Sequence, residues 1–247
     1  MSRARFARGR HNAVAKVLSG LNADFLGRAK CFFGGGTRIV LELNEYRESA
    51  VIVFLCSDRE GYRALRSTIR PDSLGEIASV PFRFLREIRT DQYGLRTVVE
   101  IDREPIKFEI VNEARIDLSG LLIQRLHVPC LDRTCCFAEK VLANADRGLD
   151  ESVASRDVMD IAYMIEAWGI EVFVDGVAKA RDAYGKGAEA SLRVSAQKLL
   201  AKKTYFKKCV TTHAISEVKT LVSGLHRIVA REWQAPQRKR PAPGPSA

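Results

Sequence analysis

Three consecutive glycines, Gly34 to Gly36, stand between a short apolar stretch and a helix-forming segment. Glycines packed this closely let the backbone approach a ligand, often a phosphate, because no side chain is in the way. Thr37 can cap the following helix, TRIVLELNEY, whose first turn points its free N–H groups at the loop. The pattern predicts a phosphate-binding loop at a helix N-terminus. The alternative is a tight turn with no ligand.

Charged side chains that could complete such a site occur later in the chain. Glu109 lies in the strand-like IKFEIV, Lys140 in the helical FAEKVLANADR, and Asp157 in the helical SRDVMDIAYMI. Lys140 could instead face solvent. Asp160 shares a helical face with Asp157, and we interpret it as a structural tie between helices. The four histidines show no ligand spacing, and we assign no chemistry to His11, His127, His213 or His226.

The segment after the predicted helix is unusual for a functional site. Arg47 and Ser49 precede the run AVIVFL, in which Val51 and Val53 must point to one face because strand side chains alternate. Arg47 could bind a phosphate or form an exposed salt bridge. By itself, the apolar run indicates a strand buried on both faces.

Strands and helices that would position these residues follow from the hydrophobic pattern. CFF and AVIVFL are expected strands, and VVEIDREPIKFEIV predicts a hairpin with a tight connection over residues 102–105. In its second strand, Lys107 and Glu109 face away from the apolar positions. From about Leu131 the periods become helical.

We therefore expect an α+β protein: a mixed sheet with flanking helices over residues 1–120, then a helical bundle over 121–235. A basic, proline-rich tail over 236–247 is expected to be disordered.

Composition sets the broad class of the protein. With 46% hydrophobic and 28% charged residues, the chain is typical of a globular protein, and no apolar run is long enough for a membrane span. The basic N-terminus lacks the apolar core of a signal peptide. A net charge of +10 indicates a polyanionic partner or simply a solvated basic surface. In AKKTYFKKC, lysines flank Tyr205 and Phe206, which suits a stacked nucleic-acid base or an exposed helix connection.

The six cysteines show neither a CxxC pair nor a zinc spacing. Cys31 and Cys56 lie in apolar segments and are expected to be buried free thiols. Such cysteines are typical of a reducing compartment, so we expect a cytoplasmic protein.

Four motifs in this order resemble one known family. FFGGGTRIVLEL, YRESAVIVFL, IKFEIV and the pair FAEKVLANADR and SRDVMDIAYMI resemble the AbiEii/AbiGii toxin family of minimal nucleotidyltransferases, over about Asp24 to Ile165. That family has a glycine loop, an Arg-x-Ser-x-Asp-x-Asp strand, a third carboxylate on a neighbouring strand, a lysine helix and a Lys-Asp step. Arg156 replaces the lysine of that step here. The order and spacing make the resemblance specific, whereas three glycines alone would be a weak signal.

The resemblance implies a magnesium-dependent transfer of a nucleotidyl group from a nucleoside triphosphate. It assigns nucleotide binding to Gly34, Gly35, Gly36, Thr37, Arg47 and Ser49, and catalysis to Glu109, Lys140 and Asp157. It places the metal ions at Glu109 and at positions 51 and 53, where the family has aspartates. Two such ions would activate the attacking oxygen and neutralise the leaving pyrophosphate.

Valine cannot bind magnesium, so this chain has the outline of the enzyme without its metal pair. We expect an inactivated toxin with an antitoxin partner, whose intact form modifies a transfer RNA end or a protein hydroxyl. The alternative is a non-catalytic module that binds nucleotide or RNA on the same fold. The glycine loop should lie beside the C-terminal end of the strand that holds Val53, with Glu109 on an adjacent strand. Lys140 and Asp157 should point into the same cleft.

Overall fold

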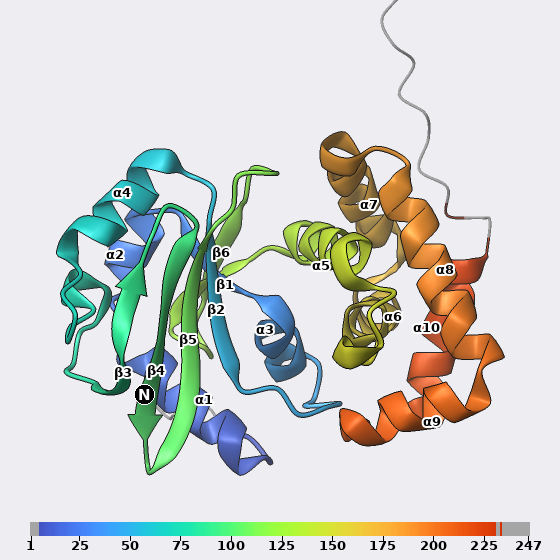
Figure 1. Ribbon diagram of the computed structural model, residues 1–247, viewed down its shortest axis with the longest axis horizontal. Helices are drawn as coiled ribbons and strands as arrows, with labels where there is room; N and C mark the ends of the chain where they lie inside the picture. Colours follow the sequence, from blue (N-terminus) through green and yellow to red (C-terminus); the bar gives the residue numbers. More distant parts are fainter. Residues whose placement is uncertain (1–4, 231–232, 234–247) are drawn as a thin grey trace, which may run out of the picture.

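The computed structural model describes residues 5–230 and 233 of the chain (Figure 1). The predicted tail over 236–247 lies outside these residues. The described part consists of a sheet with helices on both faces, followed by a group of helices, as the α+β prediction requires.

The sheet has seven strands in the order β3-β4-β5-β2-β1-β7-β6. At its centre, β2 pairs antiparallel with β1 and parallel with β5. Both β6 and β7 lie beyond residue 120, so the sheet continues past the boundary drawn from the sequence. The strands are β1 (Cys31–Gly34), β2 (Val51–Cys56), β3 (Arg83–Thr90), β4 (Gly94–Ile101), β5 (Glu104–Asn112), β6 (Gly120–Ile123) and β7 (Val128–Leu131).

Helices cover the two faces of the sheet differently. On one face lie α1 (Gly9–Ser19), α2 (Ala23–Arg28) and α4 (Arg59–Thr68), while α3 (Gly35–Glu42) lies on the other (Figure 1). Beyond α3 stand the later helices, which begin with α5 (Arg133–Arg147) and α6 (Arg156–Trp168). The others are α7 (Ile170–Tyr184), α8 (Gly187–Ala201), α9 (Lys203–Thr212) and α10 (Val218–Val229), and Gly75–Ile77 and Glu151–Val153 are short 3-10 helices.

Strand β2 is apolar because it contributes to two hydrophobic cores. Ile52 and Phe54 are buried in the core shared with α1, α2 and α4. Leu55 and the partly buried Val53 pack in the other core, which continues into the later helices. Burial on both faces explains the continuous apolar run.

Side-chain caps mark where some of the described helices begin. Asn22 and Asp58 cap α2 and α4 by accepting hydrogen bonds from Phe25 N and Gly61 N. The predicted cap at Thr37 is wrong: α3 begins at Gly35, and no side chain caps it. The hydroxyl of Thr37 instead donates to the carbonyl oxygen of Val51 at 2.6 Å, which ties α3 to the start of β2.

The predicted hairpin forms as β4 and β5, joined at Asp102 and Arg103. Both residues have positive φ angles, 51° and 67°, which is the geometry of a two-residue turn that follows the twist of the strands.

The lysine-rich segment AKKTYFKKC forms most of α9, and its lysines are exposed. Tyr205 is buried, its hydroxyl lies 3.0 Å from Ser155 Oγ, and the Lys198 ammonium covers its ring. Tyr205 is therefore not available to stack on a nucleic-acid base, and the segment fits the helix-connection interpretation better.

All six cysteines are free and buried, as expected for Cys31 and Cys56. Within residues 5–230 and 233, no helix combines the length and apolar character needed to cross a membrane.

Candidate functional site

A cleft of about 440 Å³ lies between the sheet and the helices α5 and α6. The α3 loop, β2 and β5 form one wall, and side chains from α5 and α6 form the opposite wall. Of the residues assigned to the site by the resemblance, ten line this cleft: Gly35, Gly36, Thr37, Arg47, Ser49, Val51, Val53, Glu109, Lys140 and Asp157.

Gly34 does not line the cleft, because it is the buried last residue of β1. It pairs with Val53, the third residue of β2. The expected position of the glycine loop was therefore wrong in one respect: the loop lies beside the first half of β2 and not beside its C-terminal end. The cause is the antiparallel pairing of β1 and β2, which brings the end of β1 to the beginning of its partner.

The sheet wall of the cleft is built by the parallel register of β2 and β5. Val53 pairs with Glu109, and Val51 pairs with Lys107. All four side chains line the cleft, because alternate residues of a strand face the same side. Glu109 is thus on the adjacent strand and in the same cleft, as expected.

The glycine loop presents backbone donors at the edge of this wall. The first N–H groups of an α-helix have no partner within the helix, and no side chain caps α3. Gly35 has a φ of +67°, and a Cβ there would lie 3.3 Å from the Cβ of Val53. A Cβ at Gly36 would collide with Arg47 Nη2. The positive φ at Gly35 and the collision at Gly36 therefore favour glycine at both positions. The uncapped N–H groups of this first turn are available to an anion.

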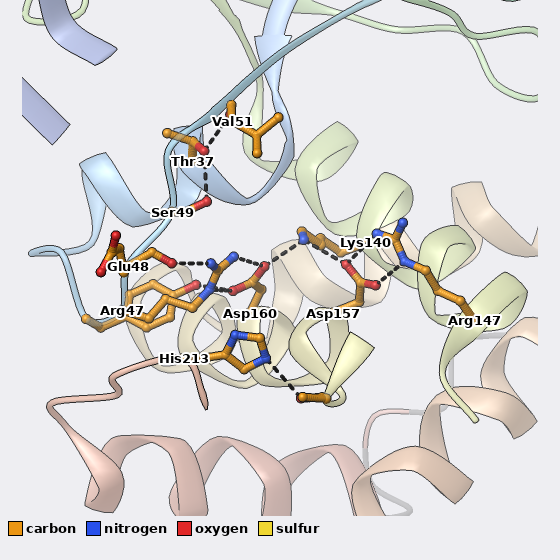
Figure 2. A network of polar contacts seen from close by, with 12 residues as sticks. Thr37, Arg47, Glu48, Ser49, Val51, Lys140, Arg147, Asp157, Asp160 and His213 are labelled. Atoms are coloured by element: carbon orange, nitrogen blue, oxygen red, sulfur yellow. Dashed lines mark hydrogen bonds and ion pairs between the residues drawn. The ribbon is translucent and has the colours of Figure 1, made fainter. Parts of the chain in front are cut away.

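A chain of ion pairs closes the helical side of the site (Figure 2). Arg47 donates to both carboxylate oxygens of Asp160, from Nε at 2.7 Å and from Nη2 at 2.8 Å. Lys140 Nζ lies 2.6 Å from Asp160 Oδ2 and 2.8 Å from Asp157 Oδ1. Arg147 Nε donates to Asp157 Oδ2 at 2.7 Å. Lys140 therefore bridges two aspartates and links α5 to α6.

This chain of ion pairs excludes two of the alternatives drawn from the sequence. Arg47 is buried and forms no exposed salt bridge. Lys140 is buried and does not face solvent. Asp160 lies on α6 and holds Arg47 by an ion pair, which is the structural role expected of it. The catalytic parts assigned to Lys140 and Asp157 by resemblance stay predictions.

Electrostatics keep these buried groups charged. Burial alone would raise the pKa of Asp160, but Arg47 and Lys140 outweigh it and lower that pKa to about 2. The pKa of Asp157 is lowered for the same reason, by Lys140 and Arg147 against the effect of burial. Burial opposes the charge of Arg47, yet the Asp160 carboxylate raises the pKa of its guanidinium.

A second polar group fixes the segment from Arg47 to Val51. Since the Thr37 hydroxyl hydrogen goes to Val51 O, Ser49 Oγ is the donor in its 2.8 Å bond to Thr37 Oγ1. The N–H of Ser49 donates to His11 Nε2 at 3.2 Å, and His11 Nδ1 donates to Glu45 Oε1 at 2.7 Å. The sequence assigned His11 no chemistry, and its part is to hold this segment.

Several cleft residues were not found from the sequence. Glu113 accepts from Arg115 Nη2 at 2.6 Å, and Glu139 lies beside this pair. Burial, and then the charge of Glu113, raises the pKa of Glu139 to about 8. Arg147 lies seven residues after Lys140 on α5. Lys107, two residues before Glu109 on β5, was placed on the face of Glu109 but was not assigned to the site. Seven residues along a helix, or two along a strand, return a side chain to the same face. These spacings could therefore have identified Arg147 and Lys107 as residues that line the cleft.

The residues present do not fit a pair of metal ions. Val51 and Val53 have no donor atom, so Glu109 is the one carboxylate left of the three that the resemblance calls for. In the part of the chain that the structure describes, no group of three or more His, Cys, Asp or Glu side chains is arranged to hold a metal.

The mixed sheet, the glycine loop and the cleft define a nucleotidyltransferase-like protein. Residues 16–245 match the family described as nucleotidyl transferase AbiEii toxin, type IV toxin–antitoxin system. Because this match covers nearly the whole chain, the protein belongs to the AbiEii family.

One solved structure shows the same fold at low sequence identity. The JHP933 protein of Helicobacter pylori is 13% identical, with a TM-score of 0.51, and the match covers 91% of this chain and 94% of that one. A second structure, of a proposed nucleotidyltransferase from H. pylori, is 12% identical with a TM-score of 0.49, covering 89% of this chain and 93% of that one. No curated protein shows significant sequence similarity to the chain.

Proposed function

We propose that this protein is an AbiEii-type toxin whose cleft binds a nucleoside triphosphate and whose valines at positions 51 and 53 prevent turnover. In the intact form, the reaction would transfer a nucleotidyl group to an acceptor hydroxyl, on a transfer RNA end or on a protein. One observation carries the proposal. The open N–H groups of the Gly35 loop, Val53 and Glu109 lie side by side on one wall of one cleft.

The chemistry of such a transfer explains why the valines matter. The reaction needs positioning and charge stabilisation more than covalent help from the protein. Removing a single preorganised group that stabilises the transition state costs about a hundredfold to a thousandfold in rate. Replacing both carboxylates by aliphatic side chains should therefore abolish turnover. Triphosphate binding through the glycine loop needs only backbone N–H donors and should weaken rather than vanish.

The family indicates the setting of this activity. A toxin of a type IV system has an antitoxin partner. Six free, buried cysteines suit a reducing compartment, and we place the protein in the cytoplasm. The two valines also favour the alternative, a non-catalytic module that binds nucleotide or RNA on this fold.

The test compares the chain as it stands with the double variant Val51→Asp, Val53→Asp. Each is incubated with magnesium, total RNA, cell protein and labelled nucleoside triphosphates, and growth is followed on induction. The double variant should label RNA or protein and slow growth, whereas the unchanged chain should do neither.

A matched control is the double variant with Glu109→Gln added, which removes the remaining carboxylate and should stop labelling. Equal labelling by the unchanged chain and the double variant would show that positions 51 and 53 do not hold the metals. No labelling by any form, with all four nucleotides, would favour the non-catalytic module.

A further inference from the structure

The sheet wall of the cleft carries a lysine beside one of the two valines that stand where the resemblance expects aspartates. Lys107 is the neighbour of Val51 in the register of β2 and β5, and both line the cleft. An aspartate at position 51 would stand directly beside this lysine. With valine there, the exposed side chain of Lys107 makes no ion pair or hydrogen bond with any described residue.

The other cations of the cleft are mostly engaged. Arg47, Lys140 and Arg147 are held by Asp157 and Asp160. Arg115 forms ion pairs with Glu113 and Asp146. Among the described lining residues, this leaves Lys107 on the sheet wall and Arg156 at the start of α6 as the cations without an ion-pair partner.

We infer that the cleft binds the triphosphate group without a divalent cation, and that the Lys107 ammonium supplies the positive charge. This inference rests on the proposed nucleotide site and concerns how its phosphates are neutralised. A wall of three carboxylates would repel phosphate oxygens unless metal ions stood between them. Here two of those three positions are valines, so the repulsion is reduced to that of Glu109.

The geometry lets Lys107 reach a triphosphate held by the glycine loop. Gly34 ends β1 beside Val53 on one side of β2, and Lys107 lies beside Val51 on the other side. Neighbouring strands are about 5 Å apart, so a lysine side chain can extend over β2 toward the loop. The ammonium is a point charge on a flexible stem, which suits phosphate oxygens of no fixed orientation.

The test is calorimetric titration of the full chain with each of the four nucleoside triphosphates and with inorganic tripolyphosphate, which has no base. Each titration is made with EDTA and again with magnesium. The unchanged chain should bind as tightly in EDTA as in magnesium, within about twofold, because no carboxylate pair needs an ion. The variant Val51→Asp, Val53→Asp should bind about tenfold more weakly in EDTA than in magnesium.

Lys107→Gln should weaken binding in EDTA about tenfold, since a hydrogen bond to a charged group is lost. Lys219→Gln is the control: Lys219 is also exposed but does not line the cleft. Binding by the unchanged chain that requires magnesium, or that Lys107→Gln leaves unaltered, would overturn the inference and leave the proposed function standing. Absence of binding by the unchanged chain and by the double aspartate variant, in EDTA and in magnesium, would overturn both the inference and the proposed function.

Discussion

At the scale of single residues, Asp160 is the most constrained group in the site. It is fully buried and accepts hydrogen bonds from Arg47 and from the hydroxyl of Tyr46, while Lys140 lies against its second oxygen. Removing one partner of a buried ion pair leaves the other charges uncompensated. The pairing of Asp160 is therefore far more important to the fold than a surface salt bridge of similar length.

Asp160→Asn should lower the free energy of unfolding by about 3–5 kcal/mol, measured by chemical denaturation. The control is Glu100→Gln, which breaks the 2.8 Å pair with Arg83, a side chain that is 74% exposed. That change should cost about 0–1 kcal/mol. Equal effects of the two substitutions would show that the buried chain of ion pairs does not stabilise the site.

Gly36 is a second residue at which one added side-chain atom would disturb the site. An alanine there would displace the Arg47 guanidinium, which Asp160 holds in place. Gly36→Ala should therefore lower the unfolding free energy by about 1–3 kcal/mol, as overpacking does. Gly27→Ala is the matched control in α2, where an added Cβ meets nothing within 4 Å. It should raise stability by about 0.4–1 kcal/mol. A neutral Gly36→Ala would contradict the close contact.

At the scale of elements, α1 is coupled to the segment before β2 through His11. Its ring bonds Glu45 and the N–H of Ser49, which requires the neutral ring. Burial lowers the pKa of His11 from 6.5, and this effect outweighs Glu45, which acts to raise it. Arg8 also lowers this pKa and Glu48 raises it. His213 is shifted the same way, chiefly by burial.

The lowered pKa of His11 makes the folded protein less stable as the pH falls. Below pH 6.5 the unfolded chain takes up a proton that the folded chain resists, so stability is present above pH 6.5 and is lost as the pH falls. Each such proton changes the free energy of unfolding by at most about 1.4 kcal/mol per pH unit. His11→Gln should reduce the slope of unfolding free energy between about pH 5 and 6.5, measured by denaturation at several pH values. His226→Gln, at an exposed position, should leave the slope unchanged. An undiminished slope in His11→Gln would contradict a buried neutral ring.

Sequence patterns predicted the elements that depend on local chemistry. Strand alternation placed Lys107 and Glu109 on one face, and both side chains line the cleft. The cap at Thr37 could not be predicted correctly, because the acceptor of its hydroxyl is Val51 O in another element. Tertiary contacts of this kind leave no local signal.

At the scale of the whole molecule, the order of the motifs predicted which segments meet in the cleft. The glycine loop, β2, β5, α5 and α6 converge although they are far apart in the sequence. The strands after residue 120 were missed, because VPCL and GLLI are short and carry no alternating polar positions. The ion pairs of Arg115 and Arg147 were missed because a lone arginine shows no pairing in a sequence.

The central claim is that the phosphates of a nucleotide bind at the start of α3. The most direct measurement is a crystal structure of the unchanged chain grown with a nucleoside triphosphate or with tripolyphosphate in EDTA. We predict phosphate oxygens within hydrogen-bond distance of the backbone N–H groups of Gly35 to Thr37, with the Lys107 ammonium beside them. Phosphates bound at another surface, such as the pocket lined by Lys16, Arg125 and His127, with the glycine loop empty, would contradict the account.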